Sequence, residues 1–172
     1  MNRVITEEEF KLFYEQTSPG LLAYLRRVAQ DAALADDVFQ EAFIRLLRSD
    51  LRESGHAARK SFLYAVATNL LRDHWRRAKK SVRWDDVENI QPMVEPVNGD
   101  PGVRMSLEKA FGRLAPLQRS LLWLAYVEAC SHKEIAAALD LREKSVKVLL
   151  FRAKNMLSEI LHSMGIRKEE IL

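Results

Sequence analysis

Cysteine, glycine and proline are scarce in this chain of 172 residues, and each scarcity excludes a class of protein. A single cysteine, Cys130, excludes an internal disulfide and a zinc site built on cysteine pairs, so we expect a small buried hydrophobe there. Six glycines and five prolines are too few for a collagen-like or low-complexity chain. No segment approaches the roughly 20 apolar residues that span a bilayer, and the N-terminus lacks the apolar run of a signal peptide. We therefore expect a cytoplasmic protein without membrane insertion.

Sequence signatures of catalytic and metal sites are also missing. The chain has no phosphate-binding glycine loop, no His-Glu-x-x-His pair and no nucleophile elbow. Its four histidines are scattered along the sequence rather than spaced as metal ligands. We expect a protein that is not an enzyme and that holds neither a metal nor a cofactor.

Charge is distributed unevenly along the chain. The formal net charge is only +3, but residues 81–103 are acidic and hold three of the five prolines, whereas residues 1–80 and 104–172 are both net positive. Acidic, proline-rich composition is typical of an extended linker. The rest of the chain has helical periodicity without strand-like alternation. The sequence therefore predicts an all-α fold of two small helical domains, residues 1–80 and 104–172, joined by a flexible acidic linker at 81–103.

Capping signals predict where the helices begin. The capping box Thr6-Glu-Glu-Glu9 starts a first helix at about Glu7, and Ser18-Pro19 starts a second over 20–30. A third helix is expected over 33–48. In the C-terminal part, helices are expected near 105–113 and over 116–127, and a second capping box, Ser131-His-Lys-Glu134, starts another.

The expected third helix has an unusual outward face, on which the apolar Ile44 lies among Asp37, Gln40 and Glu41. Such a mixture suits a docking surface for a basic protein partner, because charge steers the encounter and apolar anchors hold the complex. The alternative is an ordinary solvated face with one stray isoleucine.

Residues 62–80 predict an amphipathic helix with a basic, aromatic end. Thr68, Asn69, Arg72 and Arg76 share one face, with Trp75 at its edge. Cations attract phosphates, an amide bonds base edges and an indole stacks on an unpaired base, which suits single-stranded nucleic acid. A loop over 49–59 would wall the same edge. The alternative is a solvated charged helix end with Trp75 half-buried.

Residues 131–154 have helix-turn-helix spacing, in which Ile135 and Leu139 pack against Val146 and Leu150 across a turn plugged by Leu141. The alternative is a helical hairpin with a solvated charged face. The side chains that remain outward on the second helix suit a major groove and are Lys144, Ser145, Lys147, Val148, Phe151 and Arg152.

In order and spacing these elements resemble the extracytoplasmic-function sigma factors, a family of bacterial transcription initiation factors. The resemblance implies a protein that directs core RNA polymerase to specific promoters. Its partners would be the beta-prime and beta subunits, promoter DNA and an anti-sigma factor. The motifs that carry the resemblance are 36–43, 62–69, 73–77, 114–119, 134–136, 146–147 and 151–153.

The resemblance also implies three groups of site residues. Core polymerase would contact Asp36, Asp37, Gln40, Glu41 and Ile44. The minus-ten element would contact Asn69, Arg72, Asp73, Trp75, Arg76, Arg77, Lys79 and Lys80. The minus-thirty-five element would contact Arg142, Lys144, Ser145, Lys147, Val148, Phe151 and Arg152.

The sequence departs from the family pattern at four positions. Ala129 replaces a glycine, which we interpret as a minor change, and Arg142 replaces a capping Ser or Thr at a cost of about 1 kcal/mol. Val148 and Leu149 replace Ser and Arg, so fewer polar groups are expected to face the groove. Two rivals stay open: a dimeric helix-turn-helix regulator that never binds polymerase core, and a polymerase or anti-sigma adaptor that reads DNA poorly.

Overall fold

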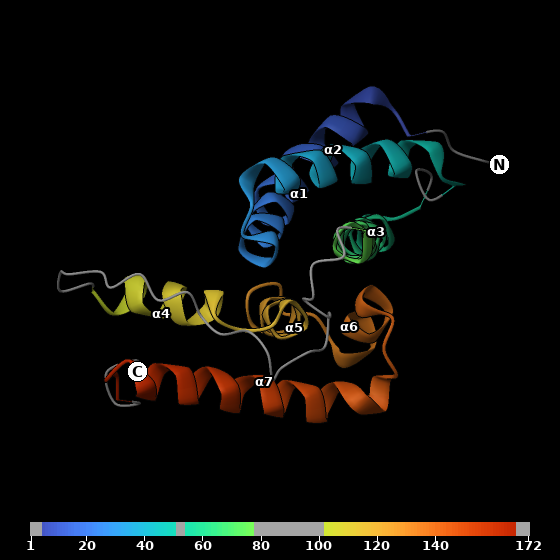
Figure 1. Cartoon of the computed structure of the whole chain (residues 1–172). Helices are drawn as coiled ribbons and strands as arrows, with labels where there is room; N and C mark the ends of the chain where they lie inside the picture. The colour runs from blue at the N-terminus through green and yellow to red at the C-terminus, as the bar shows by residue number, and fades with distance from the viewer. Residues whose placement is uncertain (1–4, 51–53, 78–101, 168–172) are drawn as a thin grey trace.

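The computed structural model describes residues 5–50, 54–77 and 102–167, and these residues form α-helices and no strand. The all-α prediction is confirmed. Residues 81–101 of the expected linker lie outside the described residues, and its last residue, Val103, is the first residue of a helix. The N-terminal half contains α1 (Glu7–Ala29), α2 (Ala32–Arg48) and α3 (His56–Arg77), and the C-terminal half contains α4 (Val103–Gly112), α5 (Pro116–Tyr126), α6 (His132–Leu139) and α7 (Glu143–Ser163), as Figure 1 shows.

Helix α1 is continuous through Pro19, so the predicted helix boundary at Ser18-Pro19 is wrong. The buried stripe Phe13, Thr17 and Leu21 runs past the proline with a spacing of four residues, and its burial keeps the two segments in one helix. Proline lacks an N–H and leaves an upstream carbonyl without its helical partner. The Ser18 hydroxyl donates a hydrogen bond to the neighbouring carbonyl of Tyr14.

The starts of α1, α2, α5 and α6 agree with the sequence to within about one residue. Both predicted capping boxes form, at Thr6 with Glu9 and at Ser131 with Glu134. Helix α2 also has a side-chain cap, because Oδ1 of Asp31 accepts a hydrogen bond of 3.0 Å from the backbone of Leu34.

An aromatic cluster holds α1 to α2. The rings of Phe10, Phe13 and Tyr14 on α1 meet those of Phe39 and Phe43 on α2, and the Tyr14 and Phe43 centroids are 4.8 Å apart. This packing orients α2 so that its opposite face points into solvent.

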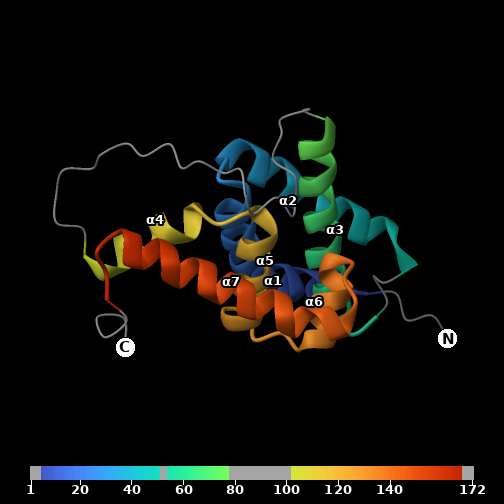
Figure 2. The same cartoon turned by 60° about the horizontal axis from the view of Figure 1, so that its bottom comes forward.

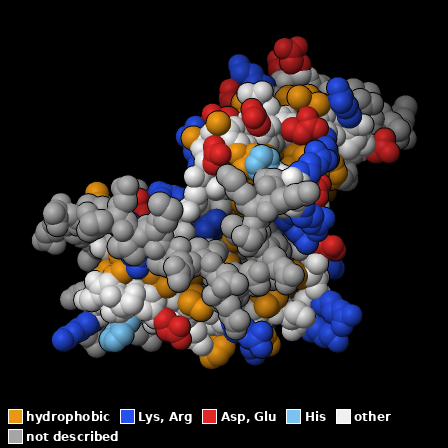
Figure 3. Space-filling view, viewed as in Figure 1, with side chains coloured by type: hydrophobic (Ala, Val, Ile, Leu, Met, Phe, Trp, Pro, Cys, Tyr) orange, Lys and Arg blue, Asp and Glu red, His pale blue; other side chains and the backbone are white. Residues whose placement is uncertain are grey.

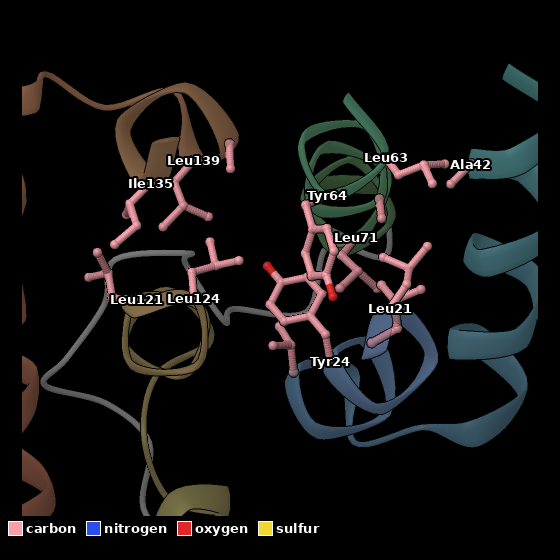
Figure 4. Packing of buried hydrophobic residues seen from close by; sticks show 14 of the residues in the cluster. Leu21, Tyr24, Ala42, Leu63, Tyr64, Leu71, Leu121, Leu124, Ile135 and Leu139 are labelled. Atoms are coloured by element: carbon pink, nitrogen blue, oxygen red, sulfur yellow. The ribbon is translucent and has the colours of Figure 1, made fainter. Parts of the chain in front are cut away.

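The two halves of the chain share one hydrophobic core, which runs from Phe13 on α1 to Ala153 on α7. Helix α3 lies along α6, and α1 lies along α5. Figure 2 shows one end of α3 next to α6. At the centre, the rings of Tyr24 and Tyr64 lie side by side with centroids 5.1 Å apart (Figure 4).

Candidate partner and nucleic-acid interfaces

The outward face of α2 carries the predicted docking residues. Asp37 and Gln40 are exposed, and Ile44 exposes 41% of its surface. Glu41 is half-buried and pairs with Arg45 at 2.8 Å, while the exposed Asp36 pairs with Arg26 on α1 at 3.4 Å. The structure therefore brings the predicted set together on one helix, with two of its acids engaged in surface ion pairs.

Leu47 belongs to the same face and was missed by the sequence reasoning. It is 43% exposed and follows Ile44 by three residues and Gln40 by seven, which places all three on one side of the helix. That spacing was the available signal. Figure 3 shows acidic and hydrophobic side chains gathered over the part of the molecule formed by α1 and α2.

The C-terminal end of α3 presents most of the predicted minus-ten residues to solvent. Asn69, Asp73, Arg76 and Arg77 are exposed, and Arg72 is half-buried. Nη1 of Arg76 lies 3.5 Å from Oδ1 of Asp73, a weak surface pair that a phosphate could displace. The remaining predicted residues, Lys79 and Lys80, lie outside the described residues.

Trp75 is half-buried and packs against the hydrophobic core. It continues the stripe Tyr64, Thr68 and Leu71, whose spacing of four and three residues marks the inner side of α3. The expectation that Thr68 lies on the exposed face is therefore wrong. Its side chain is fully buried, and its hydroxyl is hydrogen-bonded to that of Tyr24 at 2.7 Å.

The loop predicted over 49–59 ends earlier than expected. Helix α3 begins at His56, and the backbone N–H of Arg59 donates to the carbonyl of Gly55 in its first turn. The guanidinium of Arg59 lies 5.0 Å from the Phe13 ring centroid, and the His56 ring packs edge-on against the same ring. These side chains therefore anchor α3 to α1. Residues 51–53 of the predicted loop lie outside the described residues.

Helices α6 and α7 form the predicted helix-turn-helix. Ile135, Leu139 and Val146 are fully buried, and Ile135 and Leu139 point towards Leu121 and Leu124 of α5 (Figure 4). Arg142 holds the N-cap of α7, and its described side chain makes no capping hydrogen bond, as the sequence predicted. The exposed members of the predicted reading set are Arg142, Lys144, Lys147, Val148, Phe151 and Arg152, and Ser145 is half-buried.

Leu149 does not lie on the exposed face of α7, which agrees with its absence from the predicted outward set. It is half-buried and packs against the hydrophobic core, one position before the buried Leu150. Of the two residues of α7 that depart from the family pattern, only Val148 therefore lies on the exposed face that carries the predicted reading set. Lys154 is also exposed, and its ammonium lies 5.2 Å from the centroid of the Tyr126 ring.

A buried polar network joins the two halves beside the Tyr24 and Tyr64 rings. Tyr24 donates a hydrogen bond of 3.0 Å to Ser120 on α5. Tyr64 donates to Glu128 at 2.8 Å, and the other oxygen of that carboxylate pairs with Lys60 at 3.1 Å. Burial raises the pKa of Tyr24 to about 12 and also raises that of Tyr64, so both phenols are neutral at physiological pH.

Arg119 fastens the end of α1 to the C-terminal half. Its buried guanidinium donates hydrogen bonds of 2.7 and 3.2 Å to the carbonyl of Val28. It also donates to the carbonyls of Gly112 and Leu114 on its own side of the interface. Burial lowers the pKa of Arg119 to about 10, which leaves it charged at neutral pH. A cation is favoured there because these carbonyls include the negative end of a helix dipole.

The turn between α5 and α6 contains a strained residue. Ala129 has φ +52°, in the left-handed region where a β-carbon clashes with the backbone. The replacement of glycine at this position is therefore not the minor change expected from the sequence. The next residue, Cys130, is half-buried against the core as a small hydrophobe, and burial raises the pKa of its thiol.

Neither a metal site nor a membrane span is found in the described residues 5–50, 54–77 and 102–167. These ranges contain no group of three or more His, Cys, Asp or Glu side chains arranged to hold a metal ion. The helices in the same ranges include none with the length and apolarity required to cross a membrane.

The fold and its faces define a helical protein with a helix-turn-helix in its C-terminal half, and comparison with known proteins identifies its family. The sequence pattern of Sigma-70 region 2 matches residues 13–81, and that of Sigma-70 region 4 matches residues 104–157. The chain is 31% identical over 158 residues to the RNA polymerase sigma-E factor of Streptomyces avermitilis, covering 90% of this chain and 86% of the relative. It is 26% identical to the ECF RNA polymerase sigma factor SigX of Bacillus subtilis, covering 96% and 89%.

The protein belongs to the extracytoplasmic-function family of RNA polymerase sigma factors. It is an alternative sigma factor, which directs RNA polymerase to promoters. A solved structure has the same fold: the sigma factor RpoE of Bartonella quintana, in complex with the anti-sigma factor NepR. Its TM-score is 0.68 at 21% identity, covering 90% of this chain and 98% of that one.

Proposed function

We propose that α2 docks this sigma factor on core RNA polymerase, that the end of α3 contacts the melted minus-ten element, and that α7 contacts the minus-thirty-five element. Residues 1–80 and 104–172 then act as the two functional domains, with 81–103 as their linker. The two matched regions, 13–81 and 104–157, support this division. The chain supplies binding surfaces and catalyses no reaction itself. It works in the cytoplasm, where the polymerase is.

The observation that carries the proposal is the outward stripe of α2. Ile44 and Leu47 expose apolar surface beside the exposed Asp37 and Gln40, on a helix that the aromatic cluster packs against α1. Acids around apolar anchors suit a basic helical partner, which we propose to be the coiled coil of the beta-prime subunit. The C-terminal half would contact the beta subunit.

At the minus-ten element the exposed end of α3 would hold the unpaired strand. Arg76 and Arg77 attract phosphates, and the amide of Asn69 can hydrogen-bond the edge of a base. A flipped base is retained when such contacts exceed the few kcal/mol that unstacking costs. Arg72 and the accessible part of Trp75 would border this surface.

An anti-sigma factor is the remaining partner that we propose. The solved relative of the same fold is in complex with the anti-sigma factor NepR. The exposed apolar residues of α2 and α7 offer this chain surface for a comparable inhibitor.

Run-off transcription with purified bacterial core polymerase on a promoter library tests the proposal. We expect specific transcripts, and their loss in an Asp37→Lys, Glu41→Lys double variant that still folds. The matched control is Glu15→Lys with Glu159→Lys, which changes net charge equally at exposed sites on α1 and α7. Undiminished co-purification of the first variant with core enzyme would contradict the docking surface.

The same assay separates the two rivals. A helix-turn-helix regulator would bind palindromic duplexes as a dimer and would not co-purify with core polymerase. An adaptor would co-purify with core polymerase but would start no transcript at a specific promoter.

A further inference from the structure

The reading face of α7 presents apolar side chains to solvent. Val148 is 49% exposed and Phe151 is 65% exposed, although Val146 and Leu150 on the same helix are buried. Residues three apart are neighbours on a helix surface. The two exposed side chains therefore form one apolar patch in the first three turns of the recognition helix.

Cations surround this patch. Lys144, Lys147 and Arg152 are all exposed within one turn of Val148 or Phe151. An apolar centre with a cationic rim matches the major groove, where phosphates line both edges and the thymine C5-methyl is the apolar group displayed by the bases. Charge complementarity thus favours DNA as the occupant of the patch.

We propose that Val148 and Phe151 read thymine methyl groups in the minus-thirty-five element, so that this sigma factor prefers thymines at two close positions. The inference rests on the proposed DNA-reading role of α7 and adds the chemistry that is read. Three residues span about 4.5 Å along a helix, and base pairs are about 3.4 Å apart. The two side chains would therefore meet neighbouring base pairs.

Half-buried Leu149 limits how else this surface could read sequence. It packs against the core, so it cannot contact a base in the groove if Val148 and Phe151 do not. Lys147 and Arg152 remain for phosphate or guanine contacts at the flanks. Specificity at the centre of the element would then depend on methyl groups and shape.

The test uses the full chain and thymine-to-deoxyuracil substitution, which removes only the methyl group. Duplexes are first selected from a randomised upstream element with the polymerase holoenzyme, and affinity is then measured as each thymine is replaced. We expect two neighbouring positions at which the replacement weakens binding about fourfold, the equivalent of ~0.8 kcal/mol for one buried methyl group. Each of the variants Phe151→Ala and Val148→Ala should lose the response to uracil at one of the two positions and keep it at the other.

Leu12→Ala is the matched control, because Leu12 is also an exposed apolar residue but lies on α1. It should keep the full response to uracil. Selected duplexes that bind equally well with uracil throughout would overturn the inference and leave the proposed function standing. Loss of core binding by Phe151→Ala, without any response to uracil, would overturn it in favour of a protein contact. Failure to select any duplex would overturn the proposed function as well.

Discussion

The hydroxyl of Tyr64 on α3 donates a hydrogen bond to the carboxylate of Glu128, 64 residues further along the chain. The side chain of Glu128 is only 11% exposed, so this carboxylate depends on Tyr64 and Lys60 to replace water. The bond joins the two halves at the helix that we propose to read the minus-ten element.

We expect Tyr64→Phe to lower the free energy of unfolding by about 1 to 2 kcal/mol, because it removes a hydrogen bond from a buried charge. Urea denaturation measures this change. A double-mutant cycle with Glu128→Gln should give a coupling of at least about 0.5 kcal/mol. Tyr14→Phe, at an exposed tyrosine of α1, should change stability by less than about 0.5 kcal/mol. A cycle without coupling would mean that the bond contributes nothing.

Ala129→Gly should stabilise the protein by about 0.5 to 1 kcal/mol. Glycine relieves the left-handed backbone of Ala129, and this gain exceeds the added entropy of the unfolded chain. Ala23→Gly is the opposite control: Ala23 is exposed within α1, where glycine should cost about 0.5 to 1 kcal/mol. Denaturation midpoints that move in the same direction would contradict this account.

Stability should fall as pH rises above about 10. Burial raises the pKa of Tyr24 to about 12, so the native state holds this proton more tightly than the unfolded chain does. Its contribution is therefore complete below pH 10 and is lost as pH rises towards 12, by up to roughly 2 to 3 kcal/mol. Tyr24→Phe should be less stable at pH 8 but should lose less between pH 10 and 12. Parallel curves for both proteins would exclude Tyr24 as the cause.

Trp75→Ala should weaken capture of single-stranded promoter DNA by the holoenzyme by about 1 to 3 kcal/mol if the ring stacks on a base. The indole also packs against the core, so stability must be measured on the same variant. Trp123→Ala is a matched control, because Trp123 is also half-buried but lies on α5, where its ring packs against Phe111. Equal effects of the two substitutions on capture would assign Trp75 a packing role only.

A protease site inserted between residues 81 and 100 should yield two fragments that elute together on gel filtration. Separation of the fragments would expose the apolar surface of the shared core. It would also break the hydrogen bonds from Arg119 to Val28 at the end of α1. Glu128→Lys, which puts a second ammonium beside Lys60, should favour separation. Separate elution of the wild-type fragments would show that the interface is too weak to hold without the linker.

Local signals in the sequence predicted most of the helices and the helix-turn-helix. The capping boxes at Thr6 and Ser131 depend on residues three apart, so no tertiary information was needed. Pro19 misled the prediction, because burial of Phe13 and Leu21 on either side keeps the helix continuous and this depends on tertiary packing. The low helix propensity of a single proline therefore has a smaller effect on the helix than the burial of a continuous apolar face.

The interface between the halves could not be predicted, because its polar residues look like surface residues in the sequence. Thr68 is a polar residue next to Asn69 in the sequence, which suggests an exposed position. In the structure it is buried, and its hydroxyl is hydrogen-bonded to Tyr24. Glu128 has no local partner and meets Tyr64 and Lys60 only after α3 packs on α6.

The shared core has a consequence for synthesis of the protein. Tyr24 and Ser120 are 96 residues apart, and Arg119 and Val28 are 91 apart, so these bonds close only after most of the chain exists. At translation rates of about 5 to 20 residues per second, α1 waits roughly 5 to 20 s for α5, and Tyr64 on α3 waits roughly 3 to 13 s for Glu128, 64 residues later. During that interval α3 can pack on α1 and α2, but its side that meets α6 stays uncovered on the nascent chain and is accessible to chaperones until the C-terminal half is made.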